Sequence, residues 1–383
     1  MDATVAERRK AEPAQQKPLI IRRVDVVPLA LPLKKPVAMS NDTVAYAYNI
    51  LVRIEATDGT VGWGEAASAP TMTGDTQDGL VAAVRDHLGP LLVGKDAWNR
   101  QGLTRAMRTA LFGNTGAHSA VEMALLDLSG HAAEVPLIDL IGGTVRRAVA
   151  PMWLLGNPTP HDDIAEAHAK EREGFHFFKL KIGTKPIEKD IATTHLLRSA
   201  LPKTPLCADA NCGLTAADAR RYVTETRDDG LMFVEQPLPP DEIDALAALA
   251  KQSPVPIGAD ESIHALDDLE AHAQAGGRGV SLKLIKLGGM TAAVDAARCC
   301  ERLNLKVNIA AKIAESSVAS AAAVHLACAV PDVSWGVSLT HFYLAADVVR
   351  RPLPLGAGTV ALPAGPGLGV DIDEDAVARH RRR

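Results

Sequence analysis

The spacing of apolar residues divides the chain into two parts with different rhythms. In the first part, β-branched residues are frequent over 19–33 and 49–66, and the Asp-Gly pair at 58–59 predicts a turn between antiparallel strands. Three segments follow in which apolar residues recur at helical spacing: 76–92, 99–111 and 117–133. Strands that precede helices in this way predict a layered α+β domain and not a βαβ repeat.

In the second part, short apolar runs alternate with helix-like segments. Eight such runs occur, within 149–156, 176–183, 205–211, 231–237, 255–262, 279–289, 305–312 and 332–339. Eight strands joined by helical crossovers predict a (β/α) barrel of the TIM type. Periodicity alone also allows an open doubly wound sheet. Closure is favoured because no glycine-rich dinucleotide fingerprint follows the first strand and because polar residues recur at the same end of successive strands.

These patterns predict four parts: a disordered tail over 1–18, an α+β domain over 19–145, a barrel over 146–344 and a carboxyl-terminal arm over 345–383 that returns to the first domain. A chain of 383 residues with 47% hydrophobic content is long enough to bury a large core in such an arrangement.

Charge and cysteine content exclude several classes of function. The formal net charge is -5, and the lysines and arginines are scattered, so no basic face for nucleic acid is expected. The five cysteines form no Cys-x-x-Cys pair, which predicts reduced core residues in a cytoplasmic protein. The first 18 residues are polar, so we expect neither a signal peptide nor a membrane span there.

Charged residues follow the predicted barrel strands at the positions where the strands end. They are Lys179, Lys181, Asp209, Glu235, Asp260, Glu261 and Lys283. Counted from Lys181, the successive intervals are 28, 26, 25 and 23 residues, which is one βα unit each time. Because the carboxyl ends of barrel strands meet at one face, these groups are expected to converge where barrel active sites lie.

Three carboxylates, Asp209, Glu235 and Asp260, would point from adjacent strands into one volume. Ionised together, they would repel one another strongly unless a divalent cation lay between them. All-oxygen ligation predicts a hard ion, Mg²⁺ first and Mn²⁺ as the alternative. A single acid of this kind is often only a helix cap, but three in register with flanking lysines favour the metal. Glu261 alternates to the opposite strand face and is expected only behind the ligands, whereas Asn211 could contact metal or substrate.

The two lysines Lys179 and Lys181 share a strand face because side chains alternate along a strand. An isolated pair would usually be a solvated face. Here the neighbouring ammonium disfavours the protonated form of Lys181, which suits a general base. Lys283 would approach the same volume from the opposite side, whereas Lys286, three positions later, is expected to face outward. Two bases across a metal indicate removal of a proton next to a carboxylate, with the metal stabilising the enolate charge.

These motifs resemble, over about residues 19–378, the enolase superfamily, specifically the mandelate racemase/muconate lactonizing enzyme family and its muconate lactonizing subgroup. The resemblance rests on Lys-x-Lys at 179–181, Asp-Ala-Asn at 209–211, Glu-Gln-Pro at 235–237, Ala-Asp-Glu-Ser at 259–262, LKLIKLGG at 282–289, Glu-Ser-Ser at 315–317 and GPGLGV at 365–370. Each motif is weak alone, but their order and spacing make the set specific.

The resemblance implies roles for residues of this chain. Asp209, Glu235 and Asp260 would bind Mg²⁺, Lys181 and Lys283 would form the acid/base pair, and Lys179 would tune Lys181. Glu315 would lie near the substrate carboxylate. The resemblance also implies that loops 34–43 and 69–77 of the first domain cap the site, and that the protein is a homo-oligomer, a dimer or an octamer.

Two departures narrow the chemistry. The segment 306–317 contains no histidine, which argues against the His/Asp dyad of mandelate racemase itself. The dipeptide epimerases of the subgroup carry an Asp-x-Asp pair on the eighth strand that binds the substrate ammonium. This chain has no such pair there, which argues against a dipeptide substrate. His325 lies in an alanine-rich helix and is expected to be packed, while His341 could reach the rim.

The sequence therefore predicts a Mg²⁺-dependent isomerase of a small carboxylic acid, either a racemase/epimerase or a muconate-type cycloisomerase. A small cyclic or N-substituted amino acid and a muconate-like diacid both suit the site. Dehydration of a hydroxy acid or of a hydroxyproline-type substrate is the nearest competitor. A catalytically silent barrel would have lost a ligand or base, and a metal hydrolase would show histidine ligands; the sequence has neither feature.

Overall fold

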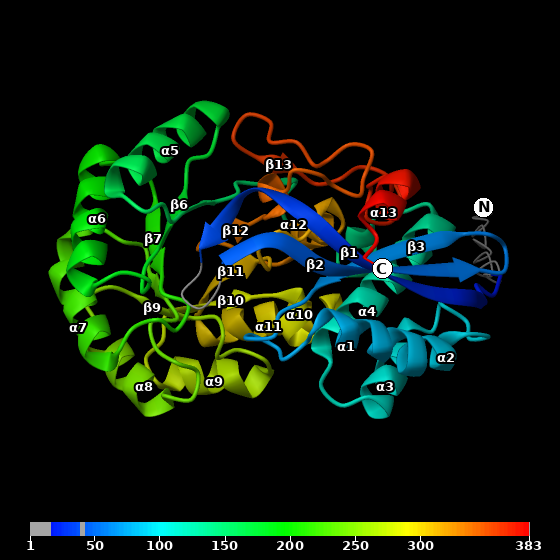
Figure 1. Cartoon of the computed structure of the whole chain (residues 1–383). Helices are drawn as coiled ribbons and strands as arrows, with labels where there is room; N and C mark the ends of the chain where they lie inside the picture. The colour runs from blue at the N-terminus through cyan, green and yellow to red at the C-terminus, as the bar shows by residue number, and fades with distance from the viewer. Residues whose placement is uncertain (1–16, 39–42, 383) are drawn as a thin grey trace, which may run out of the picture.

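The computed structural model describes residues 17–38 and 43–382 (Figure 1). The predicted tail over 1–18 therefore lies almost wholly outside the described residues, as does the centre of the predicted capping loop, 39–42. The described chain forms an antiparallel sheet with helices beside an eight-stranded parallel barrel. None of the described helices is long and apolar enough to cross a membrane.

The first domain is built on an antiparallel sheet of order β1-β2-β3. Its strands are β1 (Ile21–Ala38), β2 (Thr43–Ala56) and β3 (Val61–Ala67). Its helices are α1 (Gln77–Ala82), a π-helical turn (Ala83–Leu88), α2 (Gly89–Leu92), α3 (Arg100–Ala110) and α4 (Thr115–Ala133), with a 3-10 turn at Leu137–Leu140. The strands and helices expected from the sequence are thus confirmed, except that 76–92 is interrupted by the π-helical turn.

Helix α4 is buried along almost its whole length between β3 and the barrel. Glycines allow this contact: a Cβ at Gly64 would lie 2.0 Å from the backbone oxygen of Ala120, and one at Gly62 would lie 2.3 Å from that of Ala124. Because no larger residue fits, the backbone of β3 packs directly on the helix. This contact fixes the sheet against the element that in turn touches the barrel.

The barrel contains the eight predicted strands in the order β12-β11-β10-β9-β8-β7-β6-β5. They are β5 (Trp153–Leu155), β6 (Phe178–Lys181), β7 (Leu206–Asp209), β8 (Val234–Glu235), β9 (Ile257–Ala259), β10 (Gly279–Leu282), β11 (Lys306–Ala310) and β12 (Val337–Ser338). The ring closes just before β5, where Pro151 bridges Val337 and the Met152 amide donates to the Val337 carbonyl at 2.8 Å. The prediction of a (β/α) barrel with an α+β domain is confirmed.

Helices surround the barrel, as Figure 1 shows for those from α5 to α9. Their bounds are α5 (Pro160–Glu173), α6 (Ile187–Ala200), α7 (Ala216–Glu225), a 3-10 turn (Arg227–Asp229), α8 (Ile243–Gln252), α9 (Leu266–Gln274), α10 (Leu284–Leu287), α11 (Met290–Leu303) and α12 (Ser317–Ala329). Inside the barrel, the rings of Phe233 and Trp335 stack with their centres 4.1 Å apart, in a buried cluster with Met152, Phe177 and Cys207. This apolar plug forms the floor of the cavity above it.

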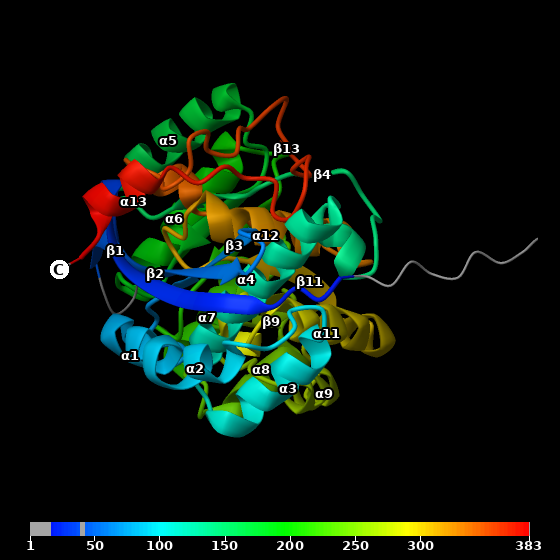
Figure 2. The ribbon, with the colours of Figure 1, turned by 90° about the vertical axis from the view of Figure 1, so that its right-hand side faces the viewer.

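The carboxyl-terminal segment runs back along the first domain (Figure 2). It contains a 3-10 turn (His341–Tyr343), β13 (Val360–Ala361), which pairs with β4 (Ala148–Val149), and α13 (Glu374–His380) beside β1. The Asp127 carboxylate on α4 accepts hydrogen bonds from the amides of Trp63 and Leu368 at 2.8 and 2.7 Å. One buried carboxylate thereby joins the sheet, α4 and this returning segment.

Candidate active site

The ring order of the barrel determines which side chains face one another. Strands β6 and β10 lie four positions apart in a ring of eight, and so do β8 and β12. Lys181 at the end of β6 and Lys283 just after β10 therefore lie on opposite sides of the cavity. The predicted carboxylates end β7 and β8 and follow β9, which places all three on the arc between the two lysines.

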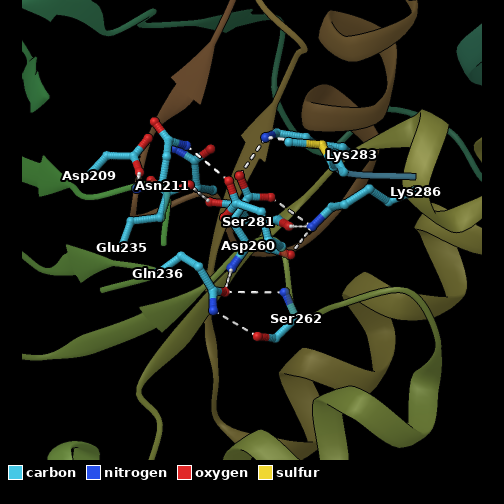
Figure 3. A network of polar contacts seen from close by, with 12 residues as sticks. Asp209, Asn211, Glu235, Gln236, Asp260, Ser262, Ser281, Lys283 and Lys286 are labelled. Atoms are coloured by element: carbon cyan, nitrogen blue, oxygen red, sulfur yellow. Dashed lines mark hydrogen bonds and ion pairs between the residues drawn. The ribbon is translucent and has the colours of Figure 1, made fainter. Parts of the chain in front are cut away.

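The three carboxylates are almost fully buried and paired with lysine ammonium groups. Figure 3 shows Asp260 with its partners Lys283 and Lys286. Lys181 Nζ lies 2.6 Å from Asp209 Oδ2, and Lys179 pairs with Glu235. Lys283 pairs with Asp260 on the far side. The structure thus brings together the five residues predicted for metal and proton transfer, and Lys179 with them.

Mutual electrostatics sets the ionisation of these groups. Burial opposes ionisation of Asp209, but the ammonium groups of Lys181 and Lys179 outweigh it and lower its pKa. For Glu235, burial prevails over the attraction of Lys179 and raises the pKa. Burial disfavours the Lys283 cation, but the charge of Asp260 reverses this and raises the Lys283 pKa. As they lie, these ion pairs hold Lys283 in its protonated form.

The donor chemistry of this arc suits a hard divalent cation. Asp209, Glu235 and Asp260 present only carboxylate oxygens, and each lies close enough to the others to disfavour their ionisation. Within the described residues, no three acidic, histidine or cysteine side chains are already arranged as the ligands of a metal ion. Each of the three carboxylates instead points toward a lysine ammonium group. These three carboxylates are the residues that could hold such a cation.

Lys286 corrects a prediction made from strand alternation. Its Nζ lies 2.7 Å from Asp260 Oδ1 and donates to the Ser281 carbonyl at 3.1 Å, so it does not face outward. Strand β10 ends at Leu282, and the short helix α10 begins before residue 286. Helical rotation therefore brings Lys286 back to the carboxylates. Burial lowers the pKa of Lys286, and the charge of Asp260, which favours the protonated amine, only partly offsets this effect.

The polar residues behind the carboxylates form a connected set. Lys181 Nζ donates to Asn211 Oδ1 at 2.6 Å, and Asn211 Nδ2 donates to Glu261 Oε1 at 3.0 Å. Glu261 is thus placed behind Asn211, where its pKa is raised to about 7 by burial and by the charge of Asp260. Asn211 has a φ of 40°, a left-handed conformation that asparagine tolerates and that turns its side chain back into the site.

Two further residues of this set were not singled out from the sequence as site residues. Gln236 Oε1 accepts the amides of Asp260 and Ser262, which ties the ends of β8 and β9 together (Figure 3). Ser281 Oγ donates to Glu235 Oε1 at 2.7 Å. The Glu-Gln-Pro motif contained the signal for Gln236, whereas a serine in a buried strand carries none.

Glu315 lies beyond β11 and is linked to the first domain. It is buried next to Glu65 of β3, and burial together with the Glu65 charge raises the Glu315 pKa to about 8. Glu65 accepts hydrogen bonds from the amides of Ser316 and Ala319 at 2.9 and 3.0 Å. A carboxylate of the first domain therefore caps barrel helix α12 beside Glu315, a connection that sequence spacing cannot reveal because 251 residues separate Ser316 from Glu65.

The two histidines near the end of the barrel are both packed. His325 is fully buried with Nε2 3.2 Å from the Leu368 carbonyl, as expected from its alanine-rich helix. His341 does not reach the rim: it is buried with Nε2 2.9 Å from the Leu353 carbonyl. The prediction for His341 was wrong because the chain turns into a 3-10 turn at that residue.

Above the ion pairs lies a small cavity lined by the two opposing lysines and the three carboxylates. The first domain contributes Met72, whose sulfur lies 3.7 Å from Lys283 Nζ, so the expected loop 69–77 does reach the site. Of the other loop, Lys34 Nζ donates to the Phe342 carbonyl and Lys35 Nζ to Glu166 Oε2 at 2.7 Å. Both contacts anchor the base of that loop to the barrel, while its centre lies outside the described residues.

Comparison with known proteins agrees with this architecture. The family model described as mandelate racemase/muconate lactonizing enzyme, N-terminal domain, matches residues 21–142, and the model described as enolase C-terminal domain-like matches residues 162–376. A chloromuconate cycloisomerase of Cupriavidus necator is 31% identical over 94% of this chain and 99% of its own.

Two solved structures show how closely the fold agrees. The muconate lactonizing enzyme from Pseudomonas fluorescens complexed with muconolactone has a TM-score of 0.92 at 28% identity, over 96% of this chain and 100% of its own. The N-succinyl Arg/Lys racemase from Bacillus cereus has a TM-score of 0.90 at 25% identity, over 95% and 99%. With both of its domains matched and the relatives covered almost end to end, the chain belongs to the mandelate racemase/muconate lactonizing enzyme family.

Proposed function

We propose that this protein is a Mg²⁺-dependent isomerase that removes the proton next to the carboxylate of a small organic acid and forms an enolate. The observation that carries the proposal is the placement of Lys181 and Lys283 on opposite sides of the cavity with three buried carboxylates on the arc between them. Two amines on opposite faces of one carbon can remove a proton on one side and return it on the other.

Asp209, Glu235 and Asp260 would hold the cation, with Mn²⁺ as the alternative. Bound there, Mg²⁺ would supply charge neutralisation for the substrate carboxylate and its enolate. Lys181 and Lys283 would exchange protons with the α-carbon once they are freed from their carboxylate partners. Lys179 would stay paired with Glu235, and Asn211 would orient Lys181 through its hydrogen bond. Glu261 would fix Asn211, and Glu315 would lie near the substrate carboxylate.

Racemisation or epimerisation and cycloisomerisation are both isomerase reactions that this site could perform. The pair of lysines favours racemisation or epimerisation, because both faces of the α-carbon then have a base. Similarity to a chloromuconate cycloisomerase supports cycloisomerisation, in which a single lysine suffices as the acid. Dehydration of a hydroxy acid would use the same enolate and would be recognised by its unsaturated product.

Proton NMR in D₂O tests the proposal. The protein with Mg²⁺ is incubated with muconate, N-acyl amino acids and proline derivatives, beside a Lys181→Ala/Lys283→Ala double variant. We expect deuterium uptake at a carbon next to a carboxylate, or lactone formation from muconate, with the wild type only. Absence of both, in protein shown by calorimetry to bind Mg²⁺, would refute the proposal.

We also propose self-association as a dimer or octamer, on the basis of the family resemblance. Size-exclusion chromatography with light scattering measures the mass directly. A single species at the 40.4 kDa mass of one chain would contradict this part of the proposal.

A further inference from the structure

Helix α3 of the first domain carries positive charge that no acid in the helix offsets. Its 11 residues include Arg100, Arg105 and Arg108 and no aspartate or glutamate. Arg105 and Arg108 are three positions apart, so their like charges are neighbours on the helix surface and repel each other. Among the described residues, none accepts a hydrogen bond from these three guanidinium groups or forms an ion pair with them.

The three arginines line a cleft between the first domain and the barrel, which lies between α3 and α11 (Figure 2). Helix α4 contacts both of these helices and forms the base of the cleft. Arg298 of α11 adds a fourth guanidinium group, and a Cβ at Gly142 would lie 3.6 Å from its Nη2. The cleft has a volume of about 510 Å³, enough for a small organic molecule, and none of its described lining residues also lines the catalytic cavity.

The base of the cleft is apolar. Its apolar side chains come from α4, from α11 and from the turn that follows α4, and they are Leu125, Leu126, Val294, Leu140 and Ile141. The first three are buried and the last two are half-buried. A ligand with an apolar body would cover this surface and remove it from water, which favours binding.

The acids of the lining indicate where a negative charge on the ligand can lie. Glu122 is buried beside the start of α11, where its Oε1 accepts a hydrogen bond from the Thr291 hydroxyl, and its Oε2 has no hydrogen-bond partner among the described residues. This carboxylate disfavours an anionic group at the inner end of the cleft. Asp295 is exposed, and its ion pair with Arg298, at 3.7 Å, is solvated and weak. An anionic group is therefore expected at the outer end, where Arg105 and Arg298 are exposed.

Exposed arginines are often simply solvated, but Arg100 is half-buried. Burial lowers its pKa, and the charge of Glu122 only partly offsets this effect. A partly desolvated guanidinium group without a hydrogen-bonded counter-ion is unfavourable, and an anion in the cleft would reduce this penalty. The four arginines also come from two domains, so the fold itself brings them together.

We propose that this cleft is a second binding site, for a small organic anion that has an apolar body and a carboxylate or phosphate head. The body would cover the leucines of α4, and the head would accept hydrogen bonds from the guanidinium groups of Arg105 and Arg298. Because Arg105 belongs to the first domain and Arg298 to the barrel, the bound anion would also hold the two domains together.

Isothermal titration calorimetry of the protein in Mg²⁺ tests this site with two probes, octanoate and phenyl phosphate, which present the two head groups. Acetate and inorganic phosphate supply the head alone, and octanamide supplies an apolar body without charge. Arg105→Ala/Arg298→Ala removes the exposed guanidinium groups of the cleft. Arg220→Ala/Arg302→Ala is the matched control, because these arginines are also exposed, on α7 and α11, but lie outside the cleft lining.

We expect at least one probe to bind the wild type and the control variant, and the probe that binds identifies the head group. Its binding to Arg105→Ala/Arg298→Ala should be about 10- to 100-fold weaker, because two charged hydrogen-bond donors are lost. The head-only and uncharged compounds should bind at least about 10-fold more weakly than the probe. Lys181→Ala/Lys283→Ala should bind the probe as the wild type does, since the catalytic cavity is separate.

Four results would overturn the inference. The first two are no binding of either probe to the wild type, and equal binding by the wild type and Arg105→Ala/Arg298→Ala. The third is binding that is lost in Lys181→Ala/Lys283→Ala instead, which would place the probe in the catalytic cavity. The fourth is a lower mass of Arg105→Ala/Arg298→Ala by light scattering, which would show that a second copy of the chain covers the cleft. The proposed function is tested separately, by deuterium exchange, and stands or fails independently of these results.

Discussion

Removing the Glu65 carboxylate should destabilise the protein far more than its single position suggests. Glu65 lies on β3 and is fully buried, yet its hydrogen-bond partners lie in the barrel, at the amino end of α12. Ser316 Oγ also donates to it at 2.5 Å, and Asn49 Nδ2 donates at 2.7 Å. Glu65→Ala would therefore break the polar connection between the first domain and the segment that carries Glu315.

The magnitude follows from the donors left behind. The amides of Ser316 and Ala319 have Glu65 as their hydrogen-bond acceptor, and both would remain buried. An unsatisfied buried donor costs about 1–3 kcal/mol, so the two amides together predict a loss of about 2–6 kcal/mol. Typical domains have a free energy of unfolding of about 5–15 kcal/mol, so this loss is a large fraction of the total. Glu65→Gln keeps one acceptor oxygen and should fall between wild type and Glu65→Ala.

Urea unfolding followed by far-UV circular dichroism measures the effect as a shift of the midpoint. Glu188→Ala is the control, because Glu188 is an exposed glutamate whose ion pair with Arg221 lies on the surface. The reasoning would be refuted if Glu65→Ala unfolded at the same urea concentration as Glu188→Ala.

Three other predictions concern ionisation and the metal. Burial raises the pKa of Asp190 to about 6, so the folded state keeps a proton that the unfolded chain releases, and stability falls as the pH rises from about 4 to 6. Urea unfolding at pH 7.5 should therefore show Asp190→Asn to be more stable than the wild type by about 1–2 kcal/mol, a value already discounted for solvent screening. Equal stability of the two proteins would contradict this prediction. Burial lowers the pKa of His325 to about 4, so the folded protein loses stability as the pH falls below about 6.5. In His325→Gln, the drop in unfolding free energy between pH 7 and pH 5 should be smaller than in the wild type by about 2 kcal/mol. An unchanged drop would count against this prediction. Calorimetric titration should detect Mg²⁺ binding to the wild type and much weaker binding to Glu235→Gln; equal binding would exclude Glu235 as a ligand.

The barrel was predictable because its strands are short apolar runs with polar residues at a constant interval. The spacing of Lys181, Asp209, Glu235 and Asp260 gave enough information to place them at one end of a closed ring, since parallel strands end on the same face. Strand alternation also predicted correctly which way a side chain faces, as long as the strand continued. Phe177, two positions before Lys179, packs in the buried cluster inside the barrel, as that alternation requires.

Prediction failed where the backbone left the strand. Lys286 was assigned to the outer face because alternation was extended beyond Leu282, where a helical turn begins. His341 was expected at the rim for a similar reason. Contacts between the domains, such as that of Glu65 with Ser316, depend on how two independently predicted units dock, and no local pattern records that geometry.

The most direct test of the central claim is stereospecific deuterium exchange by the single variants Lys181→Ala and Lys283→Ala. Each enantiomer of an exchanging acid is incubated in D₂O with Mg²⁺, and uptake at the α-carbon is followed by proton NMR. Because the two lysines face opposite sides of the cavity, each variant should lose exchange of one enantiomer and retain exchange of the other. Exchange of both enantiomers at the wild-type rate by either variant would contradict the assignment of the two lysines as opposing bases.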